Sequence, residues 1–369
     1  LLEPLLRVTG FPDTLDIIPF DTRFNDWITG EQARLPDTST DDPVWILFTS
    51  GSTGRPKGAV LTHRSFLAGL RSAALGRPVQ AMDRYYYPFP LFHVAAHNVL
   101  LQHLYGAAVV LARTFDAVDT LHACRSIGVT TLSLAPTMIA MLLDHPDFHP
   151  ADLAGVRTIG YGASAMPVSL LRRLQSISPV GLCQCYGMTE LSGSVAFLTV
   201  EDHRRAAGGR EDLRASVGWA LAPADLQLSG DVGSVCPANE SGEILVRAEQ
   251  VMQGYWQDET ASNEALQEGW LHTGDIGRFD AQGYLYIVDR KKDMIISGGE
   301  NVASREVEEA LRRNPAIRDC AVIGLPDPHW GETVSAVIVE ATPSSDRQLA
   351  QHCREILAGY KTPKMWFRA

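Results

Sequence analysis

Residues 47–58 have the sequence Leu-Phe-Thr-Ser-Gly-Ser-Thr-Gly-Arg-Pro-Lys-Gly. The apolar run 44–48 predicts a buried strand that leads into a loop. Glycines allow phosphate oxygens to approach backbone N–H groups, while hydroxyl groups and cations supply further donors. The segment therefore predicts a loop that wraps a polyphosphate such as that of ATP. Its expected ligand-binding residues are Thr49, Ser50, Gly51, Ser52, Thr53, Gly54 and Lys57.

This loop is not a Walker A loop, which has the pattern Gly-x4-Gly-Lys-[Ser/Thr]. Here Lys57 follows Pro56 and precedes Gly58. The structural alternative is a solvated Gly/Ser turn, which residues of this kind often form. We favour the phosphate loop because the strand, the hydroxyl cluster and the Lys-Gly pair occur together.

A second motif, Tyr186-Gly187-Met188-Thr189-Glu190, offers the groups that a nucleotide needs. The tyrosine has an aromatic face for a purine, and the glycine allows the backbone to come close. The threonine has a hydroxyl for phosphate, and the glutamate is a carboxylate for Mg²⁺. Taken alone, the tyrosine would be interpreted as a core residue and the glutamate as a solvated one.

Two further segments follow. Residues 269–275 have the sequence Gly-Trp-Leu-His-Thr-Gly-Asp. Asp275 suits a ribose diol because an ionised carboxylate only accepts hydrogen bonds. Residues 283–302 contain the basic run Arg290-Lys291-Lys292, for which a charged hairpin turn is the alternative interpretation.

In this order the motifs resemble those of the adenylate-forming enzymes, which include acyl-CoA synthetases, peptide-synthetase adenylation domains and beetle luciferases. The resemblance covers residues 44–302 and includes the small-residue segment 160–167. It implies that ATP, Mg²⁺ and CoA bind to this chain, with Glu190 as the metal ligand. It also implies that Lys292 is the pivot of a hinge between two domains, and that Gly298 and Gly299 line the route of CoA. The remaining nucleotide and acyl residues that it implies are Gly162, Ala163, Tyr186, Gly187, Thr189, Asp275 and Arg290.

The implied reaction needs no covalent residue on the protein. A substrate carboxylate attacks the α-phosphorus of ATP, pyrophosphate leaves, and the thiol of CoA attacks the acyl-adenylate. The chain is thus expected to be an acid–thiol ligase that works by positioning and charge stabilisation. Transfer to a carrier protein, or a nucleotide-binding module without adenylation activity, remain as alternatives. The catalytic residues implied are Lys57, His93, Thr189, Glu190 and Lys292.

Residues 89–98 bear on the identity of the acid. Amino-acid-activating relatives carry an Asp there that pairs with the substrate ammonium, and its absence here argues against a free α-amino acid. His93 matches the gate residue of the acyl pocket, with a satisfied core histidine as the alternative. Small residues nearby predict an apolar pocket for a medium to long aliphatic acid, as in fatty acid metabolism, or for an aryl acid. His93 and His97 lack the acidic neighbour of a zinc motif, so zinc is not expected.

Strand and helix signals alternate between the motifs, which predicts an α/β fold. Residues 1–289 should form a large ATP- and acyl-binding domain that includes a small β-rich subdomain within residues 216–255. Residues 290–369 should form a small mobile α+β domain, with Ser304 as the N-cap of its first helix. We expect both ends to be incomplete. Members of the resembled family carry more sequence before the phosphate loop, and they carry a catalytic lysine on a loop that would lie beyond residue 369.

The composition limits the partners. The 369 residues are 45% hydrophobic with a formal net charge of −11, so neither nucleic acid nor an anionic membrane is expected to bind. The six cysteines show no zinc or disulfide spacing, which favours a reduced, cytoplasmic setting. No apolar run has the length of a transmembrane segment. A homodimer remains open as the assembly state.

Overall fold

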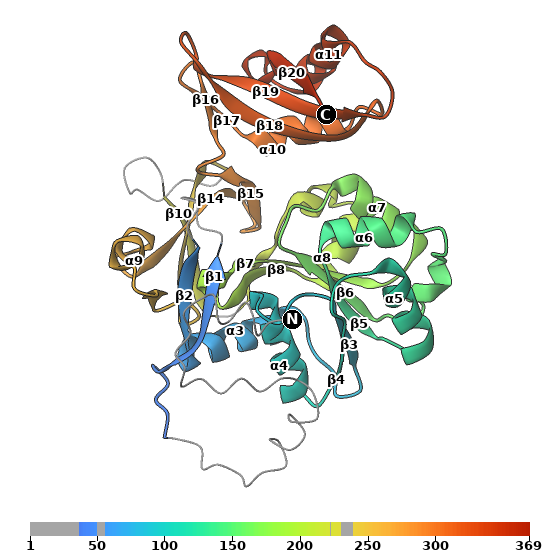
Figure 1. The fold of residues 1–369 in the computed structure, drawn as a ribbon, viewed down its shortest axis with the longest axis vertical. Helices are drawn as coiled ribbons and strands as arrows, with labels where there is room; N and C mark the ends of the chain where they lie inside the picture. Colours follow the sequence, from blue (N-terminus) through green and yellow to red (C-terminus); the bar gives the residue numbers. More distant parts are fainter. Residues whose placement is uncertain (1–36, 50–55, 222, 230–238) are drawn as a thin grey trace, which may run out of the picture. The chain divides into compact units, whose positions relative to one another are not determined.

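The computed structural model describes residues 37–49, 56–221, 223–229 and 239–369, and Figure 1 shows their fold. Helices alternate with parallel strands through the middle of the chain, and further strands follow in smaller sheets. The α/β class predicted from the sequence is therefore confirmed.

The largest sheet contains, in spatial order, β4 (Ala108–Leu111), β3 (Arg84–Tyr87), β5 (Thr131–Leu134), β6 (Thr158–Gly162), β7 (Gly181–Met188), β8 (Gly193–Leu198) and β9 (Trp219–Ala220). Its pairs are parallel from β4 to β7 and antiparallel from β7 to β9. Successive side chains of a strand alternate between faces. Accordingly, Tyr86 joins the core on one face, while Tyr85 and Tyr87 join the core on the other. Burial on both faces explains why the central strands β5 and β6 carry no charged residues.

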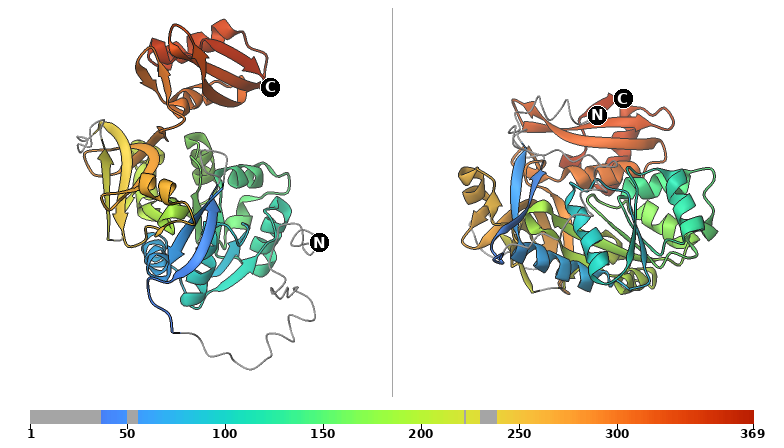
Figure 2. Two further views of the ribbon diagram at one scale, coloured as in Figure 1. Left: turned by 60° about the vertical axis from the view of Figure 1, so that its left-hand side comes forward. Right: turned by 60° about the horizontal axis from the view of Figure 1, so that its bottom comes forward.

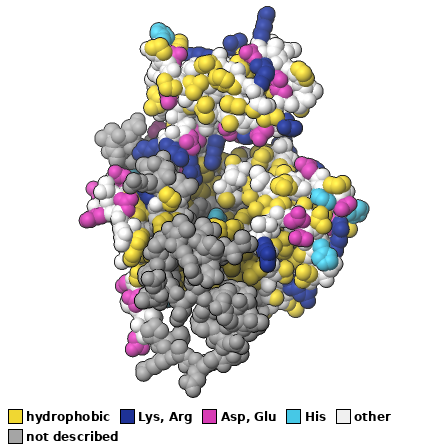
Figure 3. Space-filling view, in the orientation of Figure 1, with side chains coloured by type: hydrophobic (Ala, Val, Ile, Leu, Met, Phe, Trp, Pro, Cys, Tyr) yellow, Lys and Arg dark blue, Asp and Glu magenta, His cyan; other side chains and the backbone are white. Residues whose placement is uncertain are grey.

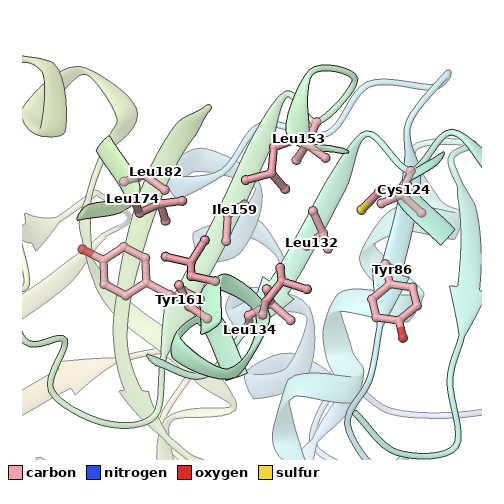
Figure 4. Packing of buried hydrophobic residues seen from close by; sticks show 14 of the residues in the cluster. Tyr86, Cys124, Leu132, Leu134, Leu153, Ile159, Tyr161, Leu174 and Leu182 are labelled. Carbon is pink, nitrogen blue, oxygen red and sulfur yellow. The ribbon is translucent and has the colours of Figure 1, made fainter. Parts of the chain in front are cut away.

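Helices cover both faces of this sheet (Figures 1 and 2). On one face lie α5 (Ala117–His122), α6 (Pro136–Asp144) and α7 (Val168–Ile177), packed on a core that Figure 4 shows from close by. That core includes Leu132, Ile159 and Leu182 from neighbouring parallel strands. On the other face lie α3 (His63–Gly76) and α4 (His97–Leu104), whose Phe66 and Leu101 share a second core.

The carboxyl ends of the parallel strands lie along one edge of the sheet. In open α/β sheets ligands bind beside this edge. Here β5 ends at Leu134, β6 ends at Gly162, and β7 leads directly into Thr189 and Glu190. Two of the predicted motifs, residues 160–167 and 186–190, thus begin on the adjacent strands β6 and β7.

Two smaller sheets stand beside the largest one. The first contains β1 (Pro43–Thr49), β2 (Lys57–Thr62) and β12 (Gly254–Tyr255), all antiparallel. The second contains β10 (Ala224–Ser229), β11 (Ser241–Ala248), β14 (Trp270–Phe279), β13 (Leu266–Gln267) and β15 (Leu285–Arg290), with α9 (Glu259–Ala265) between β12 and β13.

The β-rich section lies farther along the chain than predicted. The strands within residues 216–255 belong to different sheets, because β9 pairs with β8, β12 pairs with β2, and β10 and β11 pair with each other. The sheet that contains β10 and β11 is completed by β13, β14 and β15. The predicted range therefore contains only the first part of the β-rich region.

The C-terminal segment has a sheet and a core of its own. The sheet contains, in spatial order, β17 (Glu300–Val302), β16 (Ile295–Ser297), β19 (Gly331–Glu340) and β18 (Ile317–Asp327), and β20 (Met365–Arg368) pairs with β19 in parallel. Helices α10 (Ser304–Arg312) and α11 (Asp346–Ile356) pack on it. Val307, Val334 and Leu349 are fully buried in this core.

Ser304 is not the N-cap that the sequence predicted. The helix begins at Ser304, and its N-cap is Ala303. The Ser304 hydroxyl donates instead to Asp289 Oδ2 at 2.9 Å. Asp289 is 1% exposed, so this contact ties the start of α10 to the end of β15.

Positive and negative side chains are interspersed on the face shown in Figure 3. Exposed apolar side chains on the C-terminal sheet include Ile296, Ile323 and Phe367. Across the described ranges, none of the helices has both the length and the apolar character that spanning a membrane requires.

Candidate active site

A cavity of about 930 Å³ lies beside the carboxyl ends of the parallel strands. Its lining comes from β1, β2, β5, β6, β7 and β14 and from the segment that follows β15. It brings together most of the described residues predicted from the sequence: Thr49, Lys57, His93, Gly162, Ala163, Gly187, Thr189, Glu190, Arg290 and Lys292.

The other predicted residues have different places. Tyr186 and Asp275 are buried and contact each other next to the lining residues Gly187 and Gly274. Gly298 and Gly299 form the turn between β16 and β17, with φ angles of +65° and +83°, and they do not line the cavity. The proposed phosphate-loop residues Ser50, Gly51, Ser52, Thr53 and Gly54 lie outside the described residues.

One corner of the site is built around Asp275. Tyr186 donates a hydrogen bond from its hydroxyl to Asp275 Oδ2 at 2.9 Å, and Arg290 Nε lies 3.4 Å from Asp275 Oδ1. These contacts arise because β14 pairs with β15, which puts Asp275 opposite Arg290. Burial raises the pKa of Asp275 above its ordinary value, against the opposite effects of Tyr186 and Arg290. The corner can accept hydrogen bonds from a diol.

A second corner contains Lys57 and Glu190. Strand pairing puts Thr49 opposite Lys57, and the Lys57 ammonium lies 5.3 Å from the ring centroid of Tyr255. The Tyr255 hydroxyl donates to Glu190 Oε1 at 2.9 Å. The cation and the carboxylate therefore share one aromatic neighbour, which sequence analysis missed because a lone tyrosine on a short strand carries no functional signal.

A single carboxylate fits magnesium better than it fits zinc. Mg²⁺ in ATP sites is held by one or two carboxylates together with water and substrate phosphates. Among the described residues, no group of three or more His, Cys, Asp or Glu side chains could hold a metal ion. Glu190 is thus suited to share a magnesium ion with bound phosphates.

The segment after β15 is held by Glu243, another residue that sequence analysis missed. Glu243 accepts hydrogen bonds from Lys291 Nζ at 2.9 Å and from the Gly274 N–H at 3.1 Å, and it lies 3.3 Å from His272 Nδ1. Burial acts to raise the pKa of Glu243, but the hydrogen bonds from Lys291 and His272 outweigh it and lower the pKa. This clamp fixes the backbone on both sides of Asp275.

Two histidines lie near the opposite part of the cavity, and neither is arranged for zinc. The Ala95 N–H donates to His93 Nδ1 at 3.1 Å, and the ring of His93 is stacked on Phe89 with the centroids 5.8 Å apart. His97 Nδ1 lies 2.8 Å from the Val94 carbonyl oxygen, so this nitrogen carries the proton in the neutral ring. A buried arginine, Arg77, also lines this part, and sequence analysis gave no role to it.

The buried histidines predict an acid-sensitive fold. Burial lowers the pKa of His97 from 6.5 to about 4, and it does the same for His203. The unfolded chain therefore binds more protons than the folded chain between these two pH values. Stability is fully present above about pH 6.5 and is lost as the pH falls toward about 4. Between pH 7.5 and pH 5 we expect a loss of about 2 kcal/mol per histidine in the free energy of unfolding.

Urea denaturation at several pH values measures this effect. H203F should remove roughly half of the loss, whereas H103Q, at an exposed histidine, should keep the wild-type pH dependence. A free energy of unfolding that stays constant between pH 7.5 and pH 5 would contradict the prediction.

Comparison with known proteins agrees with this geometry. The model of the AMP-binding enzyme family matches residues 9–256, and the model of the AMP-binding enzyme C-terminal domain matches residues 306–368. The chain therefore belongs to the AMP-binding enzymes. This confirms the family that the motifs resemble.

Named relatives are CoA ligases of different substrate classes. A feruloyl-CoA synthase from an Amycolatopsis species is 39% identical, over 90% of this chain and 67% of the relative. A long-chain-fatty-acid–CoA ligase from Mycobacterium tuberculosis is 35% identical, over 92% and 68% respectively.

One solved structure of similar fold contains the acyl-adenylate intermediate of the enzyme that it describes. The o-succinylbenzoate CoA synthetase from Bacillus subtilis, in complex with its acyl-adenylate intermediate, has a TM-score of 0.81 and 34% identity, covering 90% of this chain and 66% of that one. The same enzyme with ATP and magnesium ion has a TM-score of 0.82 and 33% identity, covering 94% and 70%. The chain spans about two thirds of the length of these relatives.

Proposed function

We propose that this chain activates a carboxylic acid with ATP and transfers the acyl group to CoA, giving an acyl-CoA thioester, AMP and pyrophosphate. The observation that carries the proposal is the joint placement of Lys57, Glu190 and Arg290 on one cavity beside the Asp275 corner. Membership of the AMP-binding enzymes and the likeness to CoA ligases support it.

The residue roles follow from the two corners. We assign the ribose hydroxyls to Asp275, because its buried carboxylate accepts hydrogen bonds, and the adenine ring to the neighbourhood of Tyr186. The ammonium of Lys57 and the hydroxyls of Thr49 and Thr189 would contact the phosphates. Glu190 would hold magnesium, which stabilises the charge that develops as pyrophosphate leaves.

The CoA side of the reaction rests on fewer contacts. We assign the hinge to residues 283–302, with the domain boundary after residue 289 and Lys292 as the pivot, and we keep Gly298 and Gly299 as residues along the CoA arm. The clamp between Glu243 and Lys291 would have to open if the domains rotate between the two half-reactions. Fixed in its present position, the clamp orders the segment that contains Arg290.

For the acid we favour an aryl compound. Aromatic side chains line the cavity, among them Phe89, His93 and Phe197, and the rings of Phe89 and His93 are stacked on each other. Two of the relatives are named for aryl acids, feruloyl and o-succinylbenzoate. Because another relative is named as a long-chain-fatty-acid–CoA ligase, an aliphatic acid is the second candidate substrate, which would place the chain in fatty acid metabolism. A cytoplasmic location and a homodimer remain part of the proposal.

Mass spectrometry of the products from a mixed panel of aryl and aliphatic acids tests this function. The chain is incubated with ATP, Mg²⁺ and CoA, and a parallel reaction supplies preformed aroyl-adenylates with CoA. We expect aryl-CoA thioesters and AMP in both reactions, with pyrophosphate as an additional product of the first. A thioester with a carrier protein but not with CoA would favour the alternative acceptor. The proposal would be refuted if no thioester formed and no acyl-adenylate bound to the chain.

A further inference from the structure

A buried positive charge lines the cavity, and its hydrogen-bond partners among the described residues are all uncharged. Arg77 is 6% exposed and lines the cavity. Its hydrogen bonds go to the Leu132 carbonyl oxygen at 3.2 Å, to Ser133 Oγ at 2.8 Å and to Asn98 Oδ1 at 3.4 Å. Its guanidinium also lies 5.3 Å from the ring centroid of Tyr85. All of these partners are neutral.

The surrounding backbone makes room for Arg77. A Cβ atom on Gly160 would lie 2.0 Å from Arg77 Nη1, so the guanidinium occupies the space beside a glycine of β6. A guanidinium has five N–H donors, and the hydrogen bonds of its Nη atoms to these oxygens use three. Donor capacity therefore remains for an oxygen atom of a bound acid.

His97 provides a hydrogen-bond acceptor, whereas Arg77 provides only donors. His97 is 3% exposed and lines the same cavity, and the next residue in the chain, Asn98, accepts a hydrogen bond from Arg77. Because its Nδ1–H donates to Val94, its Nε2 can only accept. Nε2 has no hydrogen-bond partner in the part of the chain that the structure describes. A Cβ atom on Gly193 would lie 3.1 Å from Nε2, and the φ of Gly193 is +126°, so glycine is required there.

Neither residue belongs to the nucleotide corners. The contacts of Arg77 are Leu132, Ser133, Asn98 and Tyr85. The contacts of His97 are Val94 and the backbone beside Gly193. Thus the cavity lining contains a donor and an acceptor that Asn98 links, because Asn98 follows His97 in the chain and accepts a hydrogen bond from Arg77.

We propose that Arg77 and His97 together recognise a hydroxyl group on the ring of an aryl acid. The hydroxyl oxygen accepts a hydrogen bond from the Arg77 guanidinium, and its O–H donates to His97 Nε2. A methoxy group and a carboxylate cannot donate a hydrogen bond to His97. A ring hydrogen atom can neither accept a hydrogen bond from Arg77 nor donate one to His97. The proposal rests on the function proposed above, and it makes Arg77 and His97 specificity-determining residues of the acyl pocket.

Binding of non-hydrolysable aroyl-sulfamoyl adenosines, measured by calorimetry, tests this proposal without any turnover. The ligands form benzoyl and cinnamoyl series that carry hydrogen, hydroxyl, methoxy or carboxylate at the ring position opposite the acyl chain. We expect a hydroxyl ligand to bind roughly tenfold to a hundredfold more tightly than its unsubstituted match. The preference should disappear in R77M and in H97F.

R125M is the matched control, because Arg125 pairs with Asp152 at 2.7 Å outside the cavity, and it should keep the preference. The ratio of two affinities in one variant does not depend on how much of that variant is folded. Equal binding of all substituents by the wild type would overturn the proposal, as would a preference for methoxy or carboxylate, or a hydroxyl preference that survives in both variants. If none of the adenosine ligands binds, the proposed function itself fails.

Discussion

Replacing Asp275 with alanine should weaken the binding of AMP and ATP by roughly 100-fold or more. Hydrogen bonds to an ionised carboxylate are stronger than neutral ones, and D275A would remove both of those that we propose for the ribose hydroxyls. The substitution also removes the acceptor of the Tyr186 hydroxyl and the anionic neighbour of Arg290. Isothermal titration calorimetry with AMP measures the change directly.

A matched control separates this effect from a general loss of negative charge. Asp225 is exposed and pairs with Arg247 at 2.8 Å on the neighbouring strands β10 and β11. D225A should therefore leave the affinity for AMP unchanged. Melting temperatures of both variants report whether they are folded. An unchanged affinity in folded D275A would remove the ribose role from this residue.

Sequence patterns predicted those residues of the site that lie in motifs whose residue types and spacing indicate a ligand. Lys57, Glu190 and Arg290 lie far apart in the sequence, but each occurs in a motif with an evident ligand. The structure brings all of them to one cavity although they belong to strands of three different sheets: Lys57 begins β2, Glu190 follows β7, and Arg290 ends β15. Local sequence was sufficient to mark each residue, because each motif lies at one end of a strand.

The residues that were missed depend on tertiary pairing. Tyr255 reaches Glu190 only because β12 pairs with β2, and Glu243 reaches Lys291 only because β11 pairs with β14. A single tyrosine or glutamate in a strand is common in any fold, so no local signal marks it. Arg77 has the same difficulty: an arginine at the end of a helix is usually solvated, and only its burial shows otherwise.

At Ser304 and Gly298, the structure gives a different physical reason for the residue type than the sequence pattern suggested. A serine before an amphipathic helix is a good N-cap candidate, yet Ser304 contacts an acid fifteen residues earlier in the chain. Gly298 was assigned to the CoA route because it has no side chain. Its N–H donates to the Trp330 carbonyl oxygen at 2.8 Å, and its positive φ suits the tight turn between β16 and β17. The CoA role stays a prediction beside this structural one.

Gly187 illustrates the same point with a measurable consequence, because G187A should both destabilise the protein and impair nucleotide binding. A Cβ atom at this position would lie 2.0 Å from the Gly193 carbonyl oxygen and 2.5 Å from Ser194 Cα. Both are backbone atoms of β8, which cannot rotate away as a side chain could. We expect a loss of about 3 kcal/mol in the free energy of unfolding, at the upper end for overpacked sites.

G155A is the control for this substitution, since a Cβ atom on Gly155 would meet nothing within 4 Å. It should be neutral or slightly stabilising, by up to about 1 kcal/mol. Urea denaturation and AMP calorimetry on both variants decide the matter. Thr189 and Glu190 follow the last residue of β7 directly, so separation of β7 from β8 should displace them and weaken AMP binding in the fraction that still folds. Normal stability together with lost AMP affinity would instead mean that Gly187 is needed only for the approach of the nucleotide, and that β8 yields to the added methyl group.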